Sequence, residues 1–596
     1  MSHTFHIPVL GLAFSIDTPL KVARYGISSV VSVVDDELIE RMRKYHCEQN
    51  GLPYHQISKN EPGARTKRIT AYLNLLNQLV DEQFDQLKQQ PFTPGSDIER
   101  YFDLLPEDSL LKVGYELMME YGEGERKEAF QRVLREYMHK GSIDVNIMAK
   151  VDKLNYDANG SYTGDENTDA LAGLRGFAES TLASSVILSA GMNPKLYSYL
   201  ETFSDFYPNE DGYLRKKITL KVSNYRSAFI QAKFLAKKGM WVSEFRIESG
   251  LNCGGHAFAT DGLLMGPILE EFNTERSKMQ LELFEMYQAA LAAKGFLVHS
   301  VPAQRISAQG GIGTGEENKF LIDHYGLDAT GWGSPFLLVP EATNVDEGTL
   351  QLLTASKHDD YYLSNSSPLG VLFNNFKNSG IEQERLSRIA RNRPGSPCTK
   401  KYLCSNTEFT EQPICTASRE YQHLKIKELD KKNVAGEEYD RQFERITEKV
   451  CLCEGLAASV YIKNDMLKRG ERSAVAICPG PNLAYFSNTY SLDEMVAHIY
   501  GKINLLQNNA RANVFINELN LYIDYLKREI SIYLENVNDK KGKYLQNFRD
   551  QLQLGIRYYQ QLIPQMTNYT AGYLEKMFSD LVSSEQQLGL LSIDPV

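Results

Sequence analysis

The sequence predicts an α/β protein built on a (β/α)8 TIM barrel, with a helical insertion after the second strand and a mainly helical C-terminal domain. The first 345 residues contain eight short β-branched or apolar runs, most of them followed by a helical pattern. Eight is also the number of strands that closes this barrel. The runs are residues 8–14, 28–34, 144–150, 185–191, 217–223, 241–247, 304–310 and 327–333.

The spacing of the runs sets the domain boundaries. Roughly a hundred residues separate the second run from the third, too many for an ordinary connection. Residues 36–142 show helical periodicity, so we expect a helical insertion there that is a candidate lid. The barrel takes residues 1–35 and 143–345. Beyond it we expect a cysteine-containing, loop-rich region over 346–490 and a helical region over 491–596, where apolar residues recur at helical spacing.

Composition excludes several classes of protein. A chain of 596 residues, 42% hydrophobic and 24% charged, matches a globular protein of two or three domains. The net charge of −11 argues against nucleic acid or an anionic membrane as partner, because both reward clustered Lys and Arg. The N-terminal residues lack the features of a signal peptide, and no apolar stretch is long enough to span a membrane. We therefore expect a cytoplasmic protein.

Two glycine-rich segments follow the seventh and eighth runs. Glycines let a ligand approach the backbone, and the N–H groups that open a helix bind anions such as phosphate. Barrels often bind phosphate with these two loops. Glu316 breaks the Gly-x-Gly-x-x-Gly fingerprint of dinucleotide sites, so the pattern favours FMN over NAD as resident cofactor. The expected contacts are Gly310, Gly311, Gly313, Gly331, Trp332, Gly333 and Ser334.

The order of these motifs resembles nitronate monooxygenase (2-nitropropane dioxygenase) and its relatives, the FMN-dependent enoyl-acyl-carrier-protein reductases and the enoyl reductase of polyunsaturated fatty-acid synthases. The resemblance covers the barrel. It rests on residues 7–10 with 17–20, 145–147, 187–191, 221–223, 248–256 (Glu-Ser-Gly-Leu-Asn-Cys-Gly-Gly-His), 308–312 and 331–342. It implies an FMN-dependent oxidoreductase.

The resemblance assigns the proton-transfer residue. In the family a Gly-Gly-His segment after the sixth strand sets a histidine beside the flavin, and the matching residues here are Gly254, Gly255 and His256. An imidazole titrates near ~6.5 and is the usual proton-transfer group at neutral pH. Relatives carry Glu-Ala or Asp-Ser ahead of the glycines, whereas this chain has Asn252 and Cys253, which leaves the substrate class open.

Further flavin contacts follow from the same resemblance. They are Gly11, Leu12, Ala13, Asn146 and Lys221. A cation at Lys221 would stabilise the negative charge of the reduced flavin, with Lys150 as the competing candidate and a surface lysine as the alternative for either. Cys253 is either a reactive thiolate or a small buried residue.

The cysteines beyond the barrel are candidate metal ligands. Cys398, Cys404, Cys415, Cys451, Cys453 and Cys478 follow one another at spacings of 6, 11, 36, 2 and 25. Thiolates hold zinc or iron–sulfur clusters, and we consider Cys398, Cys415, Cys451, Cys453 and Cys478 as the ligands. No Cys-x-x-Cys pair is present, so buried free thiols are the alternative.

The leading hypothesis is an FMN-dependent oxidoreductase like nitronate monooxygenase, acting on a small-molecule or acyl substrate, with NAD(P)H as a candidate electron donor. An enoyl (C=C) reductase of a lipid or polyketide pathway is the alternative within this class. A flavin-binding scaffold is the alternative outside it, because more than half of the chain lies outside the resemblance. Its C-terminal helices are a candidate surface for a protein partner or for a second copy of the chain.

Overall fold

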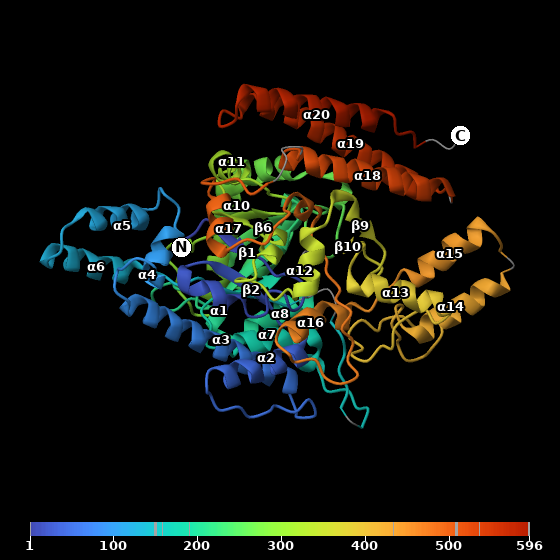
Figure 1. Cartoon of the computed structure of the whole chain (residues 1–596), viewed down its shortest axis with the longest axis horizontal. Helices are drawn as coiled ribbons and strands as arrows, with labels where there is room; N and C mark the ends of the chain where they lie inside the picture. The colour runs from blue at the N-terminus through green and yellow to red at the C-terminus, as the bar shows by residue number, and fades with distance from the viewer. Residues whose placement is uncertain are drawn as a thin grey trace.

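Eight parallel strands close into a barrel in sequence order in the computed structural model (Figure 1). The structure describes residues 2–147, 152–157, 159–189, 191–432, 434–506, 511–535 and 537–593. The barrel strands are β1 (Phe5–Ile7), β2 (Ser28–Ser32), β3 (Ile143–Asn146), β4 (Ser185–Leu188), β5 (Lys217–Val222), β6 (Val242–Glu248), β7 (Arg305–Gln309) and β8 (Ala329–Gly331). β1 pairs with both β2 and β8, which closes the barrel and confirms the predicted fold class.

The predicted first strand, residues 8–14, does not overlap the observed one. β1 ends at Ile7, and residues 8–14 turn across the end of the barrel. Pro8 has no N–H to donate to a strand ladder, and Gly11 has a left-handed φ of 54° that a strand does not contain. Residues 148–150 of the third run, Lys150 included, and Ala190 of the fourth run lie outside the described residues.

The insertion after β2 is helical, as predicted. It contains α2 (Asp36–Gln49), α3 (Ala64–Gln89), α4 (Asp97–Asp103), α5 (Leu110–Glu120) and α6 (Glu125–Tyr137). Helix α3 packs on α2 and on α7 (Asp169–Ala178), so it covers the flank of the barrel. Helices α5 and α6 extend away from that flank (Figure 1). No residue of 36–142 lines the main cavity described below, but Arg65 of α3 lines the smaller cavity next to it.

The region after the barrel contains more regular structure than the loop-rich prediction allowed. It forms α12 (Glu347–Thr354), the hairpin of β9 (Tyr361–Ser364) and β10 (Phe373–Phe376), α13 (Gly380–Ala390), α14 (Arg419–Lys431), α15 (Glu437–Thr447) and α16 (Leu452–Lys463). Several of these helices are short and polar, and α14 and α15 are largely exposed, which explains why apolar periodicity did not reveal them. Residues 391–418 and 464–480 keep the predicted loop character.

Long amphipathic helices complete the chain, as predicted. Helices α18 (Val514–Glu535), α19 (Asp539–Leu562) and α20 (Ala571–Gly589) pack on one another, and α18 and α19 also pack on α10 (Met265–Ala293) of the barrel. They form the layer at the top of Figure 1. The short α17 (Leu492–Ile499) precedes them and begins with a capping box of Ser491 and Glu494. No helix in the described residues has the length and apolar character needed to cross a membrane.

A buried carboxyl group joins α18 to the loop after β6. Glu518 is 1% exposed and accepts hydrogen bonds from the Ser249 hydroxyl at 2.5 Å and from the Met265 N–H at 2.8 Å. Burial, only partly offset by these two hydrogen bonds, raises the pKa of Glu518 to about 7. The packing of the C-terminal helices on the barrel is therefore linked to pH.

We expect the free energy of unfolding to fall as pH rises from about 4.5 to about 7, because the unfolded chain releases the Glu518 proton earlier than the folded chain. The contribution lost over that window is on the order of 3 kcal/mol. Urea denaturation of the wild type and Glu518→Gln at pH 5 and pH 8 measures it. The stability difference between the two proteins should change with pH, and a constant difference would contradict the assignment.

Candidate active site

A cavity of about 230 Å³ opens at the carboxyl ends of the barrel strands, where the sequence places the flavin. Most of the predicted flavin contacts line it. They are Gly11, Leu12, Asn146, Lys221, Gly254, Gly255, His256, Gly310, Gly311, Gly331, Trp332, Gly333 and Ser334. Two predicted contacts do not. Ala13 is fully buried beneath the turn after β1, and Gly313 is covered by Arg511, which would lie 2.5 Å from a Cβ at that position.

Several polar groups in and beside the glycine loops of this cavity have no hydrogen-bond partner in the described residues. The backbone N–H groups of Gly311, Ile312 and Gly333 donate no hydrogen bond within the described residues. The side chain of Asn252 is 1% exposed, yet its amide nitrogen and oxygen are both unpartnered there. Buried polar groups in folded proteins are almost always paired, so these groups point to a polar ligand. Convergent backbone N–H groups suit a phosphate, so the residues present fit FMN.

The helix that follows the first glycine loop is not the anion site that the sequence suggested. Helix α11 (Gly315–Tyr325) starts there, but the carboxylate of its own Glu317 accepts the Gly313 N–H at 2.8 Å. The end of α17 also covers this terminus, since a Cβ on Gly315 would lie 2.4 Å from Gly501. The protein's own carboxylate thus takes the place of the expected phosphate. The available N–H groups belong to the loops themselves.

Arg511 ties the glycine loop to the C-terminal region. Its guanidinium pairs with Glu317 at 2.6 Å, and the two side chains are 4% and 0% exposed. It also donates to the Gly311 carbonyl at 2.5 Å and to the Asn482 side chain at 2.8 Å. Asn482 in turn donates to the Ile312 carbonyl at 3.0 Å. The Gly311 carbonyl shares its peptide group with the Ile312 N–H, so the bond from Arg511 turns that N–H away from the guanidinium.

The charged residues at the cavity floor form one network. Lys221 of β5 pairs with Glu248 of β6 at 2.9 Å, and Gln309 of β7 donates to the same carboxylate at 2.8 Å. Burial alone would raise the pKa of Glu248, but Lys221 and these hydrogen bonds hold it below its ordinary value. Burial, reinforced by Glu248, raises the pKa of Cys253 well above its ordinary value, so Cys253 stays a thiol. The buried-residue interpretation of Cys253 is the one that fits.

Arg246, Glu248 and Asn252 are site residues that the sequence analysis did not select. All three line the cavity. Arg246 is 2% exposed and pairs with Glu244 at 3.0 Å inside the barrel. A period-two signal was present, because positions 244, 246 and 248 alternate along one strand and therefore face the same side. Asn252 was noted as a departure from the family pattern but was not selected as a contact.

His256 is held by the hairpin that follows the barrel. The N–H of Asn374 donates to the Gly255 carbonyl at 2.9 Å, and the His256 ring meets Phe373 of β10 edge-on at 5.1 Å. The Nε2 atom of His256 hydrogen-bonds the Ser367 hydroxyl at 2.8 Å, and Ser367 is fully buried. These contacts fix the ring at the cavity wall.

A smaller, mostly apolar cavity of about 70 Å³ continues beyond His256. It shares Leu12, Val34, His256 and Leu456 with the main cavity. The remaining apolar residues of its wall are Val33, Ile147, Ala170, Leu403, Leu452 and Cys453. A substrate beside His256 therefore has an apolar annex next to it.

The predicted cysteine set divides between two places. Cys478 lines the main cavity and accepts the Gly255 N–H at its carbonyl at 2.9 Å, so it does not belong with the other cysteines. Cys404, which was not selected, lies 3.7 Å from Cys398, sulfur to sulfur. Across the described residues, no three His, Cys, Asp or Glu side chains already stand in the arrangement of a bound metal ion.

Comparisons with known proteins give structural similarities alone. No family model and no curated protein matches this chain. Among solved structures, FabK from Thermotoga maritima aligns with a TM-score of 0.36 at 11% identity, over 89% of this chain and 96% of that chain. The enoyl reductase domain of MlnA from Bacillus amyloliquefaciens aligns with a TM-score of 0.34 at 14% identity, over 69% and 89%. A nitroalkane oxidase from Streptomyces ansochromogenes aligns with a TM-score of 0.24 at 14% identity, over 57% and 87%. The fold assignment itself rests on the strand order of the barrel.

We expect Arg511→Met to lower the free energy of unfolding by about 3–5 kcal/mol, because it leaves the buried Glu317 carboxylate without its cation. Chemical denaturation measures the change. Arg528→Met is the control. This half-buried arginine donates to the Leu363 carbonyl and forms no ion pair within the described residues. Equal losses in the two variants would contradict a special role for the buried pair.

Proposed function

We propose that this chain is an FMN-dependent oxidoreductase whose active site is the cavity at the carboxyl ends of the barrel strands. The observation that supports it best is the set of unpartnered N–H groups at Gly311, Ile312 and Gly333, in the two loops where barrels hold phosphate. Lys221 and Arg246 add positive charge to the same cavity. An anionic, largely planar cofactor suits such a lining.

FMN, when bound, would supply two-electron redox chemistry. The protein's part would be to bind the phosphate with the loop N–H groups, to offset negative charge with Lys221 and to hold a proton at His256. The buried Ser367 hydroxyl would orient the imidazole through its Nε2 atom. His256 would then exchange a proton with a substrate lying between the ring and the cofactor.

The apolar annex beside His256 favours C=C reduction of an acyl substrate as the version of this chemistry. Its walls are mainly aliphatic, which suits an alkyl chain better than a small nitronate anion. In that reaction two electrons and a proton reach one carbon as a hydride, and His256 gives a proton to the neighbouring carbon. A nicotinamide dinucleotide would provide the hydride. Nitronate oxidation is the alternative reaction, and measurement of the flavin half-reactions distinguishes the two.

We expect the purified full-length chain to contain about one FMN per chain, because the loop N–H groups need an anionic partner. Flavin released by heat denaturation is identified and quantified by chromatography. Arg511→Met should lower this content, since it frees the loop that presents those groups. A protein that neither contains FMN nor binds it when FMN is added would overturn the proposal.

We expect His256→Gln to keep the bound flavin and lower turnover by roughly 10²–10⁴-fold, the usual contribution of a general acid or base. Stopped-flow spectroscopy separates the two half-reactions. Flavin reduction by NADPH or NADH should be unchanged, whereas flavin reoxidation by an enoyl thioester, or flavin reduction by a nitronate, should slow. His358→Gln is the matched control, because His358 lies on the surface with a side chain 61% exposed. If both variants turn over like the wild type, His256 is not the proton-transfer residue.

A further inference from the structure

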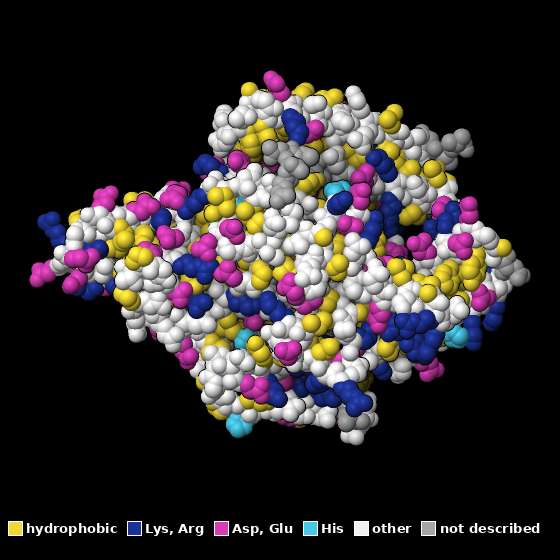
Figure 2. Space-filling model, viewed as in Figure 1, with side chains coloured by type: hydrophobic (Ala, Val, Ile, Leu, Met, Phe, Trp, Pro, Cys, Tyr) yellow, Lys and Arg dark blue, Asp and Glu magenta, His cyan; other side chains and the backbone are white. Residues whose placement is uncertain are grey.

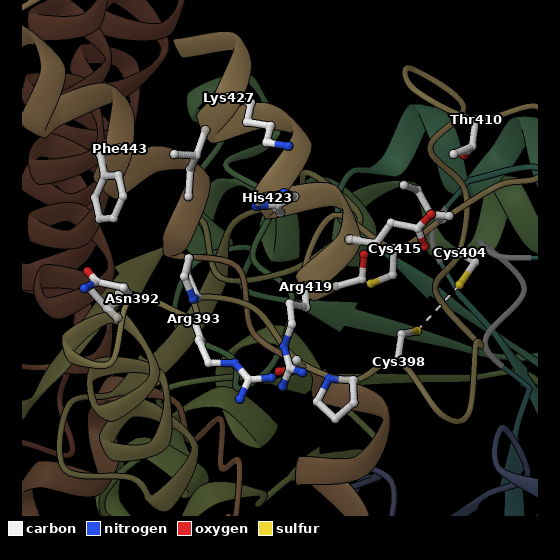
Figure 3. Close-up of a pocket in the computed structure, with 18 of the residues that line it drawn as sticks. Asn392, Arg393, Cys398, Cys404, Thr410, Cys415, Arg419, His423, Lys427 and Phe443 are labelled. Atoms are coloured by element: carbon white, nitrogen blue, oxygen red, sulfur yellow. Dashed lines mark hydrogen bonds between the residues drawn. The ribbon is translucent and has the colours of Figure 1, made fainter. Parts of the chain in front are cut away.

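Five cysteines that are far apart in the sequence gather outside the barrel. Cys398 and Cys404 belong to one loop, Cys415 precedes α14, and Cys451 and Cys453 stand at the start of α16. The thiol of Cys398 hydrogen-bonds to Cys404, and Cys415 lines the same cleft. Cys453 contacts Cys451 and also interacts with Cys415 and Cys398. Figure 3 shows Cys398, Cys404 and Cys415 together at one end of a cleft of about 1200 Å³.

Backbone N–H groups donate to three of these sulfurs. The Lys401 N–H donates to Cys398, the Ala417 N–H to Cys415 and the Glu454 N–H to Cys451. In each case the donor follows its cysteine by two or three residues. A hydrogen bond to a sulfur stabilises the thiolate relative to the thiol. Lys401 reaches its position with a left-handed φ of 57°, so this loop accepts a strained backbone where it turns around the sulfur.

The spacing of the sulfurs matches a small ion better than a disulfide or a large cluster. The Cys398 and Cys404 sulfurs lie 3.7 Å apart. A tetrahedron with Zn–S bonds of about 2.3 Å has edges of about 3.8 Å, whereas a disulfide bond is about 2.05 Å long.

We propose that Cys398, Cys404, Cys415 and Cys453 bind a structural zinc ion. Four thiolates with no open position are a common structural zinc site. We assign Cys453 as the fourth ligand because it is the thiol of the α16 pair whose charge couples to both Cys398 and Cys415. The ion has to draw the sulfurs together, since no three described side chains are already in ligand arrangement. Three of the four cysteines lie within 391–418, which forms neither helix nor strand, so closing around an ion disrupts little regular structure.

The surroundings of the cysteines carry compensating positive charge. A zinc ion with four thiolates has a net charge of about −2. Lys401 and Lys153 act on Cys404, and Arg472 acts on Cys451. Arg393 and Arg419 line the same cleft as the sulfurs (Figure 3), and Lys and Arg side chains gather over α13 and α14 on the surface (Figure 2). The site is therefore electrostatically suited to an anionic centre.

A zinc ion here would join the 391–418 loop to the start of α16, which Thr399 also contacts through Glu454. This is the role that a metal or a disulfide plays where a hydrophobic core is small. This inference stands apart from the proposed flavin chemistry, because the ion would have no open position for substrate.

The test is the metal content of the full-length protein purified without a metal-affinity step. We expect about one zinc per chain by mass spectrometry of the metals, reduced at least roughly tenfold in Cys398→Ser and in Cys453→Ser. Cys451→Ser and Cys47→Ser should keep the zinc, because Cys451 is not a proposed ligand and Cys47 lies in α2 away from the cluster. Loss of zinc in Cys451→Ser with retention in Cys453→Ser would overturn the ligand assignment.

Cobalt keeps the proposal testable where a serine variant fails to fold. Wild-type protein expressed with Co²⁺ should show the thiolate-to-cobalt charge-transfer band and the intense visible bands of a tetrahedral site. Iron with inorganic sulfide and a broad visible absorption would overturn the zinc assignment in favour of a cluster. Wild-type protein that contains neither metal and does not take up Co²⁺ or Zn²⁺ in equilibrium dialysis would overturn the site altogether.

Discussion

The buried pair of Arg511 and Glu317 is the contact on which the candidate active site depends. It is almost fully removed from solvent, and its two members come from the last part of the chain and from the helix after β7. A buried ion pair contributes little net stability when intact, but an orphaned partner is strongly unfavourable. Its effect is therefore on uniqueness. In the observed arrangement of the glycine loop, Glu317 and the Gly311 carbonyl both accept from Arg511, and the Ile312 N–H, in the same peptide group as that carbonyl, is turned away from it.

The same dependence on later segments holds for the other side of the cavity. His256 is supplied by the barrel, but β10 and Ser367 fix its orientation, and both belong to the region that follows the barrel. Leu456 and Cys478 close the lining from the same region. The barrel thus supplies conformationally permissive glycine loops at the carboxyl ends of its strands. The segments that follow the barrel cover these loops and enclose the cavity. The insertion after β2 packs on the flank and contributes Arg65 of α3 to the wall of the smaller cavity.

The sequence predicted what local patterns encode. Seven of the eight strands fall within their predicted runs or begin one residue from them, since period and β-branching are local properties. The glycine loops and His256 follow from motifs. The failures are long-range. Glu317 occupies the anion position at the start of its own helix. Its placement depends on Arg511, which is nearly two hundred residues away in the sequence. Cys478 lies in the main cavity, whereas Cys404 lies beside Cys398. Both placements depend on how a loop without periodicity packs. Spacing along the chain carries no information on either.

The loop that carries Cys398 and Cys404 connects the cysteine cluster to the candidate active site. Between the two cysteines lie Tyr402 and Leu403, which form part of the wall of the apolar annex beside His256. Tyr402 donates to Asp35 of the segment after β2 at 3.0 Å, so one end of this wall is anchored to the barrel. The other end is held by the backbone pairing of Asn406 with Ile414 and by the contact between Cys398 and Cys404. A loop without helix or strand has no ladder of backbone hydrogen bonds to define it. The shape of the annex, and with it the size of group accepted beside His256, therefore follows from how firmly those sulfurs are held.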